Sequence, residues 1–448
     1  MRWLTPPRLF IGSFALLVLL GTLGLKYLPG LYTGEPLNWV DALFTATSAV
    51  CVTGLIVVDT ATYFTMSGQA FILLLIQLGG LGMLTFTSLI IVALGRRLSL
   101  RHDALPTGTR EAAPHLDTRR LTVDVVRFTL LLEAVGAFAL YVLWIPRFGW
   151  TGAVWPAVFH SVSAFCNAGF STFSDSLIGF QHAPFSLAIV MALIVVGGLG
   201  FLTLEEVYLR WRAQQRAEIF RVSLHSRIVI VTTLALLAGG WVLFGCFEWH
   251  HLLADLPFLH KLTNALFMSV TPRTAGFNTV DYAKAMESSN FLTIILMMIG
   301  GSPGSTAGGI KTTTFALIGL LAWSRLMGYE KTTFWSRSVR EETTERAVGL
   351  FVLAFGLVVL GVFLLTTTES FYPVDGRFLD RMFEVVSAFN TVGLSTGVTP
   401  TLTVPGRWLI IVLMFCGRVG PLAVAAAIAV RQPVASSFRY AYEDVVVG

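Results

Sequence analysis

The chain has little cysteine and little charge, and each shortage excludes a class of protein. Four cysteines in 448 residues, without metal-ligand spacing, provide neither a zinc module nor a disulfide framework. Only 13% of the residues are charged, and no nucleophile–base pair or cofactor motif stands out among them. Nothing therefore supports an enzyme. The longest loop predicted on the cytoplasmic side, about 25 residues, is too short to be a nucleotide-binding domain.

Apolar residues are abundant instead. They make up 55% of the chain, and the mean hydropathy is +0.73, which is typical of an integral membrane protein. Eight stretches have membrane-spanning length: 9–28, 70–95, 122–145, 185–209, 227–247, 289–323, 347–367 and 405–430. The first stretch follows basic residues, as a signal peptide would, but it runs to Leu28 without a small-residue cleavage site, so we expect a span.

One short phrase occurs four times. It reads Ser-Ala-Val-Cys-Val-Thr-Gly in its first copy and ends at Gly54, Gly169, Gly276 and Gly393, which are 115, 107 and 117 residues apart. A period near 110 residues predicts a fourfold repeat. The third copy has one extra residue between its serine, Ser269, and its glycine, so we expect its helix to be offset by one.

A weaker apolar segment precedes each repeated glycine, between two spans. These segments are too short to cross a membrane: 38–53, 153–168, 259–275 and 376–392. A half-length helix followed by irregular backbone is tolerated at membrane depth only inside protein or beside water. We therefore predict an all-α protein of eight transmembrane helices, in four parallel span–pore helix–span repeats around a pseudo-fourfold pore. The repeats cover residues 1–105, 119–215, 222–330 and 340–448.

The basic residues give the orientation. Five segments that alternate with pairs of spans carry 21 of the 31 Lys and Arg, so all five lie on one side, which is the cytoplasm. Both termini are then cytoplasmic. A basic pI near 9.1 is explained by this topology and does not require nucleic acid. Since each repeat crosses twice, the repeats are parallel, which disfavours a secondary transporter built from inverted halves.

The repeated loops have the chemistry of a cation filter. A dehydrated monovalent cation needs oxygen ligands, and a ring of backbone carbonyls provides them without fixed charge. Glycine permits the positive φ and close approach that such a loop requires. The candidate ion-binding residues, potassium being the metal, form four tripeptides: Val52, Thr53 and Gly54; Asn167, Ala168 and Gly169; Thr274, Ala275 and Gly276; and Thr391, Val392 and Gly393.

The later span of each repeat is also rich in glycine. Gly79-Gly-Leu-Gly82 and Gly197-Gly-Leu-Gly200 are adequately explained by close helix packing. The third copy differs, because Gly300 to Gly309 contains only one regular helix former, and such backbone lies beside water or protein. Its sequence differs from the phosphate-binding loop motif by one residue, because Ile310 separates the last glycine from Lys311. No predicted strand precedes it, so nucleotide binding is not expected.

The chain resembles the Ktr/Trk/HKT potassium-transporter superfamily over essentially all of its length. The resemblance rests on the four repeats, the single glycine in each loop, and Thr271-Pro-Arg-Thr-Ala-Gly276-Phe-Asn. Trk-type members carry two more spans before the first repeat, so the resemblance favours a membrane subunit of the Ktr type. It implies an intramembrane gating loop below the filter. The gate candidates are Gly300, Gly301, Ser302, Pro303, Gly304, Ser305, Thr306, Ala307, Gly308, Gly309, Lys311 and Arg418.

Arg418 lies midway along the last span, where a guanidinium is expensive and marks a functional site. One interpretation pairs it with a carboxylate, Glu133 or Glu384. The other, which the superfamily's arginine at this position supports, places its charge in the cavity below the filter as a barrier to cations. The two are compatible, since a pore-facing arginine still needs acceptors such as carbonyls of the gating loop.

The resulting prediction is potassium uptake across the bacterial cytoplasmic membrane without ATP chemistry or a bound cofactor. Potassium is the substrate, and sodium is a candidate activator. From the resemblance we expect a homodimer in membrane lipid, docked on a cytosolic ring of nucleotide-binding regulatory subunits. A sodium-selective or unselective path of the same fold is the first alternative, and an inverted-repeat transporter the second. In some members that favour sodium a serine replaces the first filter glycine, whereas all four are glycine here.

Overall fold

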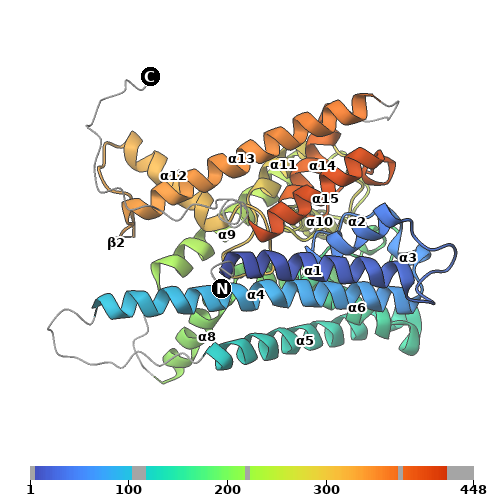
Figure 1. Ribbon diagram of the computed structural model, residues 1–448, viewed down its shortest axis with the longest axis horizontal. Helices are drawn as coiled ribbons and strands as arrows, with labels where there is room; N and C mark the ends of the chain where they lie inside the picture. Colours follow the sequence, from blue (N-terminus) through green and yellow to red (C-terminus); the bar gives the residue numbers. More distant parts are fainter. Residues whose placement is uncertain (1–5, 103–117, 217–221, 336, 372–376, 421–448) are drawn as a thin grey trace.

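The computed structural model describes residues 6–102, 118–216, 222–335, 337–371 and 377–420. Within these residues the secondary structure is almost entirely helical. Many of the helices run along the long axis of the molecule (Figure 1). A two-stranded antiparallel hairpin, β1 (Thr333–Phe334) and β2 (Arg337–Ser338), is the one sheet of the described residues.

Five described helices are long and apolar enough to cross a membrane: α1 (Pro6–Tyr27), α4 (Met66–His102), α5 (Thr118–Gly152), α9 (Leu224–Glu248) and α13 (Glu341–Ser370). Their outward faces are apolar as well. Phe138 on α5 is 69% exposed and Phe363 on α13 is 63% exposed. Continuous apolar surface of this kind requires a nonaqueous surrounding, so the protein is a multi-pass membrane protein.

Four short helices lie between the longer ones: α2 (Trp39–Val50), α6 (Val154–Phe165), α10 (Phe258–Val270) and α14 (Phe378–Phe389). Three of them lie wholly inside a predicted re-entrant segment, and α10 begins one residue before its segment, 259–275. Each packs against the long helix that precedes it, α1, α5, α9 and α13 respectively. The chain thus consists of four successive units, each with a long helix, a short helix, a loop and a further helical segment.

The units close into a ring. Each short helix packs against the later helix of the preceding unit, as α6 does on α4, α10 on α7 (Pro184–Leu199), and α14 on α11 (Glu287–Met298). The series is completed by α2, which packs on α15 (Val404–Val419) of the fourth unit. Four similar contacts in cyclic order are what a pseudo-fourfold arrangement around one axis requires.

Three of the predicted spans differ from the structure. The span over 185–209 bends by 103° at Gly200 between α7 and α8 (Phe201–Gln215), so its glycines both pack and break the helix. The span over 289–323 is two helices, α11 and α12 (Thr312–Leu326), separated by irregular backbone that includes the predicted loop 300–311. In the last span α15 ends at Val419, and residues 421–430 lie outside the described residues.

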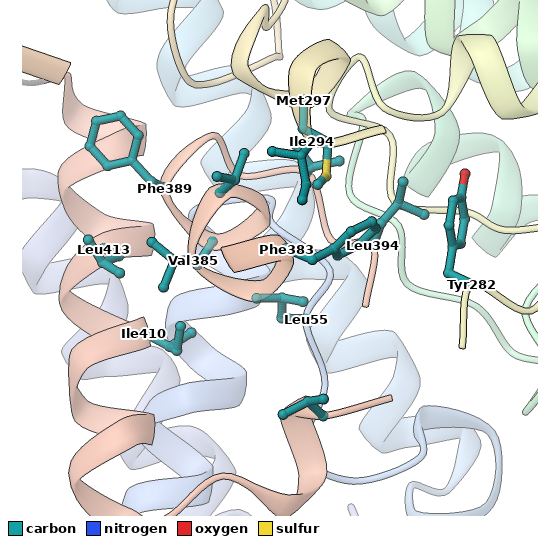
Figure 2. Close-up of a cluster of buried hydrophobic side chains, with 14 of the residues drawn as sticks. Leu55, Tyr282, Ile294, Met297, Phe383, Val385, Phe389, Leu394, Ile410 and Leu413 are labelled. Atoms are coloured by element: carbon teal, nitrogen blue, oxygen red, sulfur yellow. The ribbon is translucent and has the colours of Figure 1, made fainter. Parts of the chain in front are cut away.

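Small elements complete the outer loops: α3 (Thr60–Tyr63) and the 3₁₀ turns Ile178–Phe180 and Thr399–Thr401. The largest buried cluster joins three units, as Figure 2 shows. Phe383 and Phe389 of α14 pack with Leu413 of α15, Met297 of α11 and Leu55 from the first loop. Burial of several aromatic rings in one cluster stabilises the fourth unit between its neighbours.

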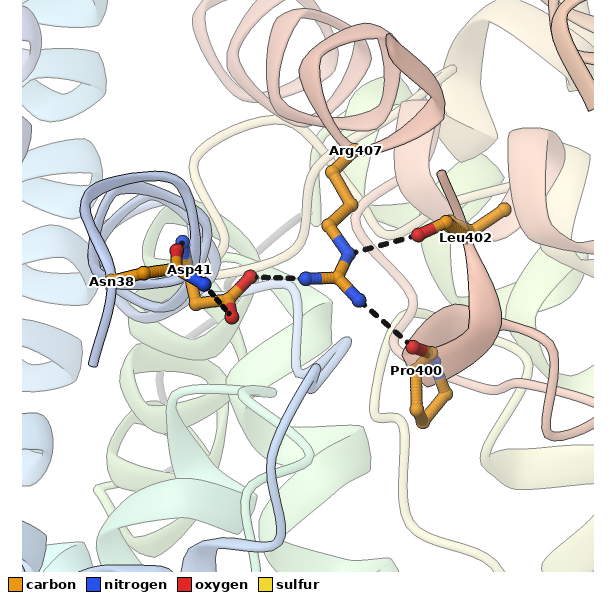
Figure 3. Close-up of polar contacts among 5 residues, drawn as sticks. All are labelled: Asn38, Asp41, Pro400, Leu402 and Arg407. Carbon is orange, nitrogen blue, oxygen red and sulfur yellow. Dashed lines mark hydrogen bonds and ion pairs between the residues drawn. The ribbon is translucent and has the colours of Figure 1, made fainter. Parts of the chain in front are cut away.

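An ion pair joins the first and fourth units, which no linker connects. The Arg407 guanidinium on α15 donates to the Asp41 carboxylate in the first turn of α2 (Figure 3). Arg407 also donates to the carbonyls of Leu402 at 3.0 Å and Pro400 at 2.9 Å. Asn38 caps α2 by accepting from the Asp41 amide at 2.8 Å. Asp41 lies in the first turn of α2, where a carboxylate also suits the helix dipole.

We expect Arg407→Gln to destabilise the protein. Both side chains of the pair are mostly buried, and loss of the guanidinium leaves the Asp41 carboxylate with the Asn38 amide as its one described side-chain partner, at a cost of roughly 1–3 kcal/mol. A lower melting temperature in detergent is the readout. The matched control is Arg377→Gln, because Arg377 and Glu287 also join two units, but both are largely exposed and exposed pairs contribute little. Equal shifts in the two variants would contradict the role of Arg407.

Candidate functional site

The four repeated glycines meet in a closed ring. A methyl group added to Gly54 would lie against the Ala168 carbonyl oxygen and 3.1 Å from the Gly169 Cα atom. The same addition at Gly169 would lie 2.9 Å from the Gly276 Cα atom, and at Gly276 3.2 Å from the Gly393 Cα atom. At Gly393 it would lie 3.0 Å from the Gly54 Cα atom. The order is therefore cyclic, and no side chain fits at any of the four positions.

Backbone conformation repeats as closely as the contacts do. All four ring glycines have positive φ, between 71° and 91°. The residue two positions earlier is also left-handed in every copy, although it is never glycine: Val52, Asn167, Thr274 and Thr391. Such conformations cost of order 1–3 kcal/mol each and persist only where the surroundings hold them. The sequence analysis predicted a positive φ for the glycines alone and did not predict it for these four residues.

Hydroxyl groups hold the loops from behind. Ser48 Oγ donates to the Leu55 carbonyl at 2.7 Å and accepts from the Gly54 amide at 3.1 Å. Ser163 Oγ donates to the Phe170 carbonyl at 2.8 Å, and Ser387 Oγ accepts from the Gly393 amide at 3.1 Å. These bonds fix the direction of each loop after its short helix, which is the support that strained backbone needs.

In the third loop the expected alignment is wrong. Thr271, not Ser269, donates to the carbonyl after the glycine, that of Phe277. Ser269 Oγ instead donates to Leu237 O on α9 at 2.8 Å, as Ser161 Oγ does to Glu133 O on α5 at 2.7 Å. The third loop is therefore one residue shorter than the others rather than one longer. Sequence matching failed because a threonine replaces the serine of the other copies.

A cavity of about 300 Å³ opens on one side of the ring. Its lining includes all four ring glycines and residues that follow them in the chain. Three carboxylates, one from each of the first three units, also line it: Asp59, Asp175 and Asp281. Asp59 accepts from Ser174 Oγ at 2.5 Å and Asp281 pairs with Lys284 at 3.2 Å, so both also order the loops.

The glycine-rich segment, residues 299–311, lies on the other side of the ring. A methyl group on Gly308 would meet Thr391 Oγ1, and one on Gly309 would meet Asn390, both of which precede the ring glycine Gly393. The segment is folded back on itself, since the Gly300 amide donates to the Ile310 carbonyl at 2.8 Å. Most of its residues are buried, so it fills the space directly behind the loops.

Hydrogen bonds tie this segment to the bend between α7 and α8. The Ser302 amide donates to the Gly198 carbonyl at 3.0 Å, and the Phe201 amide donates to the Gly304 carbonyl at 2.9 Å. Thr306 Oγ1 donates to the Gly197 carbonyl at 3.1 Å. Within the segment, Lys311 Nζ donates to the Ala307 carbonyl at 2.6 Å. These bonds bring the predicted gate residues together. They also explain where α7 ends, because the Phe201 amide donates to the segment instead of to a carbonyl of α7.

Arg418 reaches the same segment. Its guanidinium is 1% exposed and donates to the Thr306 carbonyl and, at 3.1 Å, to the Gly79 carbonyl of α4. The two carboxylates considered as partners are engaged elsewhere. Glu133 accepts from Gln77 at 2.9 Å, and Glu384 accepts from Thr399 at 2.8 Å. Arg418 therefore donates to carbonyls, one of them on the glycine-rich segment, and to neither carboxylate, and its Nε has no partner among the described residues.

Among the described residues no group of three or more His, Cys, Asp or Glu could hold a metal ion. The arrangement offers something different. Four strained loops meet around one axis, with an open acidic cavity on one side and a buried segment on the other. Such a site suits passage of a cation along the axis rather than chemistry on a bound substrate.

The comparisons agree with this class of protein. The sequence profile of the TrkH family, described as cation transport proteins, matches residues 20–440, and the chain belongs to this family. It is therefore a cation transporter rather than an enzyme, and the expected membership of the Ktr/Trk superfamily is confirmed.

Individual relatives are similar to this chain over most of its length. The potassium/sodium uptake protein NtpJ of Enterococcus hirae is 37% identical, over 99% of this chain and 98% of its own length. The Ktr system potassium uptake protein B of Vibrio alginolyticus is also 37% identical, over 99% of this chain and 95% of its own. The crystal structure of the potassium transporter TrkH from Vibrio parahaemolyticus has a TM-score of 0.74 at 19% identity, covering 93% of this chain and 83% of that one, and shows the same fold.

Proposed function

We propose that this protein is the membrane subunit of a Ktr-type potassium uptake system and that the ring of four loops is its selectivity filter. The single observation that carries the proposal is the closed contact of Gly54, Gly169, Gly276 and Gly393 in cyclic order. One glycine from each unit, each at positive φ, supports loops whose backbone carbonyls replace the water of a potassium ion. Two similar proteins named for potassium uptake support the choice of ion.

The path runs from the acidic cavity inward. Eight crossings with both termini in the cytoplasm place that cavity outside, where Asp59, Asp175 and Asp281 raise the local cation concentration. The ion then loses water at the loops and passes the glycine-rich segment and Arg418. The inward membrane potential contributes about 2.3 kcal/mol per charge for each 100 mV. Accumulation therefore needs no ATP chemistry in this chain.

We propose that the glycine-rich segment and Arg418 close the path. The segment is buried directly behind the loops, and the Arg418 guanidinium is held there by carbonyls from two units. A positive charge at this place opposes a cation electrostatically, and glycine-rich backbone has many conformations of similar energy. Displacement of the segment removes the first obstacle and takes from Arg418 one of its two carbonyl acceptors.

Arg418→Gln tests the barrier. A unit charge about 8 Å from the ion, at an effective dielectric constant of about 20, opposes it by roughly 2 kcal/mol. Because 1.4 kcal/mol corresponds to a tenfold change, we expect flux without a regulator to rise about tenfold or more. Ion flux and the yield of folded protein are measured together. A lower yield with no faster flux would identify Arg418 as a structural residue only, and Arg418→Lys, which keeps the charge, should stay close to wild type.

The partners follow from the relatives. Proteins named as components of a Ktr system imply that the membrane subunit works with a separate regulatory subunit. We propose a homodimer, each protomer with its own path, docked on a cytosolic ring of nucleotide-binding regulatory subunits. Helix α12 continues from the glycine-rich segment, and α8 continues from the bend at Gly200, which is hydrogen-bonded to that segment. These two helices therefore offer a mechanical route between regulator and gate.

Growth of a bacterium that lacks its own potassium uptake systems tests the proposed function. Expression of this chain with its regulatory partner should restore growth at submillimolar potassium, and added sodium should not compete for uptake. A sodium-selective or unselective path of the same fold is the second candidate, favoured by the potassium/sodium name of one relative. Uptake of sodium at the same rate as potassium in these cells would establish that alternative.

A further inference from the structure

The two ends of the glycine-rich segment are held by side chains from two different filter loops. Arg273 in the third loop donates from Nη2 to the Gly300 carbonyl at 3.5 Å. Asn390 in the fourth loop accepts at Oδ1 from the Ile310 amide at 3.3 Å. Each of these side chains lies three residues before a ring glycine, Gly276 or Gly393. Equivalent positions in two units therefore contact the start and the end of one segment.

Asn390 is completely buried and fully oriented. Its Nδ2 donates to the Val386 carbonyl at 3.0 Å, which leaves Oδ1 directed at the segment. The segment also packs on the backbone here. A methyl group on Gly309 would lie 3.0 Å from the Asn390 Cα atom, and one on Gly308 would meet the left-handed Thr391. A displacement of residues 308–310 thus changes the contacts of the fourth filter loop directly.

Arg273 is 7% exposed, and its Nη1 has no partner among the described residues. Beside it lies a cavity of about 10 Å³, lined by Thr233, Gly198 and Gly301 among others. Thr233 Oγ1 is likewise buried and unpaired in the described part of the chain. One water molecule fits such a volume and needs two or more polar partners. Arg273 Nη1 and Thr233 Oγ1 would be the polar partners of a water in this cavity.

The same position in the other two units has no such role. It is occupied by Cys51 and Cys166, and the Cys166 thiol donates to Gln77 Oε1 at 3.5 Å on α4 rather than to the segment. The contact with the segment is therefore specific to the third and fourth loops. The segment belongs to the third unit, and the fourth unit is the next one in the ring, so both polar side chains lie where they can reach it.

We propose that Arg273 and Asn390 are positioning residues that couple the filter to the gate, so that potassium in the filter stabilises the closed segment. The proposal rests on the proposed function of the site. The Gly300–Ile310 hydrogen bond joins the two held ends, so a displacement of the segment alters its contacts with both loops. Coupling of this kind is reciprocal: if the segment's position alters ion binding, then ion binding alters the segment's position by the same free energy.

Thiol labelling in detergent tests the coupling. Pro303 is a partly exposed residue of the segment, and Pro303→Cys places a thiol there once the more accessible Cys246 and Cys416 are replaced by alanine. We expect a maleimide to react about fivefold more slowly in potassium than in sodium, the low end of usual coupling. Arg273→Gln and Asn390→Ala should bring the two rates together. Arg273→Lys, which keeps a charged donor, should restore part of the difference, and Cys166→Ser should leave it intact.

The outcomes separate the inference from the proposed function. Uptake of potassium over sodium is measured in liposomes with the same parent protein. If the parent prefers potassium but labels equally fast in both ions, or if the rate ratio survives in both Arg273→Gln and Asn390→Ala, the coupling is overturned while the filter stands. If the parent shows no preference for potassium, the proposed function is overturned, and this inference with it.

Discussion

Gly276→Ser should lose most of the potassium preference of the protein while it still inserts and folds. A side chain at φ near 79° is strained, and its Cβ atom would lie 2.6 Å from the Val392 carbonyl oxygen and 2.9 Å from the Gly169 Cα atom. Strain of this kind costs of order 1–3 kcal/mol, and 1.4 kcal/mol is tenfold in affinity. We therefore expect the potassium concentration for half-maximal uptake to rise roughly tenfold or more and the preference over sodium to fall.

The matched control is Gly30→Ser. Gly30 also has positive φ, at 75°, but a Cβ atom there would meet nothing within 4 Å, because it lies in an exposed outer loop. It reports the cost of the backbone conformation without the ring contact. Unchanged potassium-over-sodium preference in Gly276→Ser, at normal yield, would contradict the filter assignment. Equal losses of preference in both variants would contradict it as well, since the ring would then have no special part.

Removal of Ser302 through Gly308 should give flux that no longer depends on the regulatory partner. These residues make the hydrogen bonds to Gly197 and Gly198 and provide the carbonyl that Arg418 binds. Without them the space behind the ring is open, and the guanidinium loses one of its two acceptors. Flux of the purified deletion variant in liposomes should equal the regulated maximum of the wild type, with or without the regulator and its nucleotide.

A point substitution provides the milder form of the same test. Gly308→Ala places a methyl group against Thr391 Oγ1, so the segment must shift away from the fourth loop. Flux without the regulator should rise, though less than in the deletion. Gly319→Ala in α12 is the control, because nothing lies within 4 Å of the added atom. A deletion variant that inserts normally and keeps its full dependence on the regulator would show that the gate lies elsewhere.

The ring of glycines was predictable because repetition carries the information. A single glycine after a short helix is an ordinary turn, but four at one period in four similar contexts indicate one shared axis. The structure brings the four ring glycines into contact with one another and with the residue before each of them. The left-handed Val52 and Thr391 were not predictable in the same way, since β-branched residues avoid this conformation and only the surrounding contacts impose it.

Identical motifs behaved differently where tertiary contacts differ. Gly-Gly-Leu-Gly occurs in α4 and in α7, yet α4 continues through it and α7 ends. Both first glycines pack against the end of a short helix, Gly79 on Val50 and Gly197 on Phe165. The break at Gly200 arises because the glycine-rich segment lies there and accepts the hydrogen bond of Phe201. The residues around the second motif give no sign of that contact, which is made by a distant part of the chain. The sequence therefore predicted close helix packing and not the break.

The most direct test of the filter is the position of a bound ion. Crystals of the protein grown with thallium or rubidium, which substitute for potassium and scatter anomalously, should show a peak on the axis of the ring. It should lie within the loops that end at Gly54, Gly169, Gly276 and Gly393, and excess potassium, but not sodium, should displace it. An anomalous peak found only away from this axis, in crystals whose protein transports the same ion, would contradict a path through the four loops.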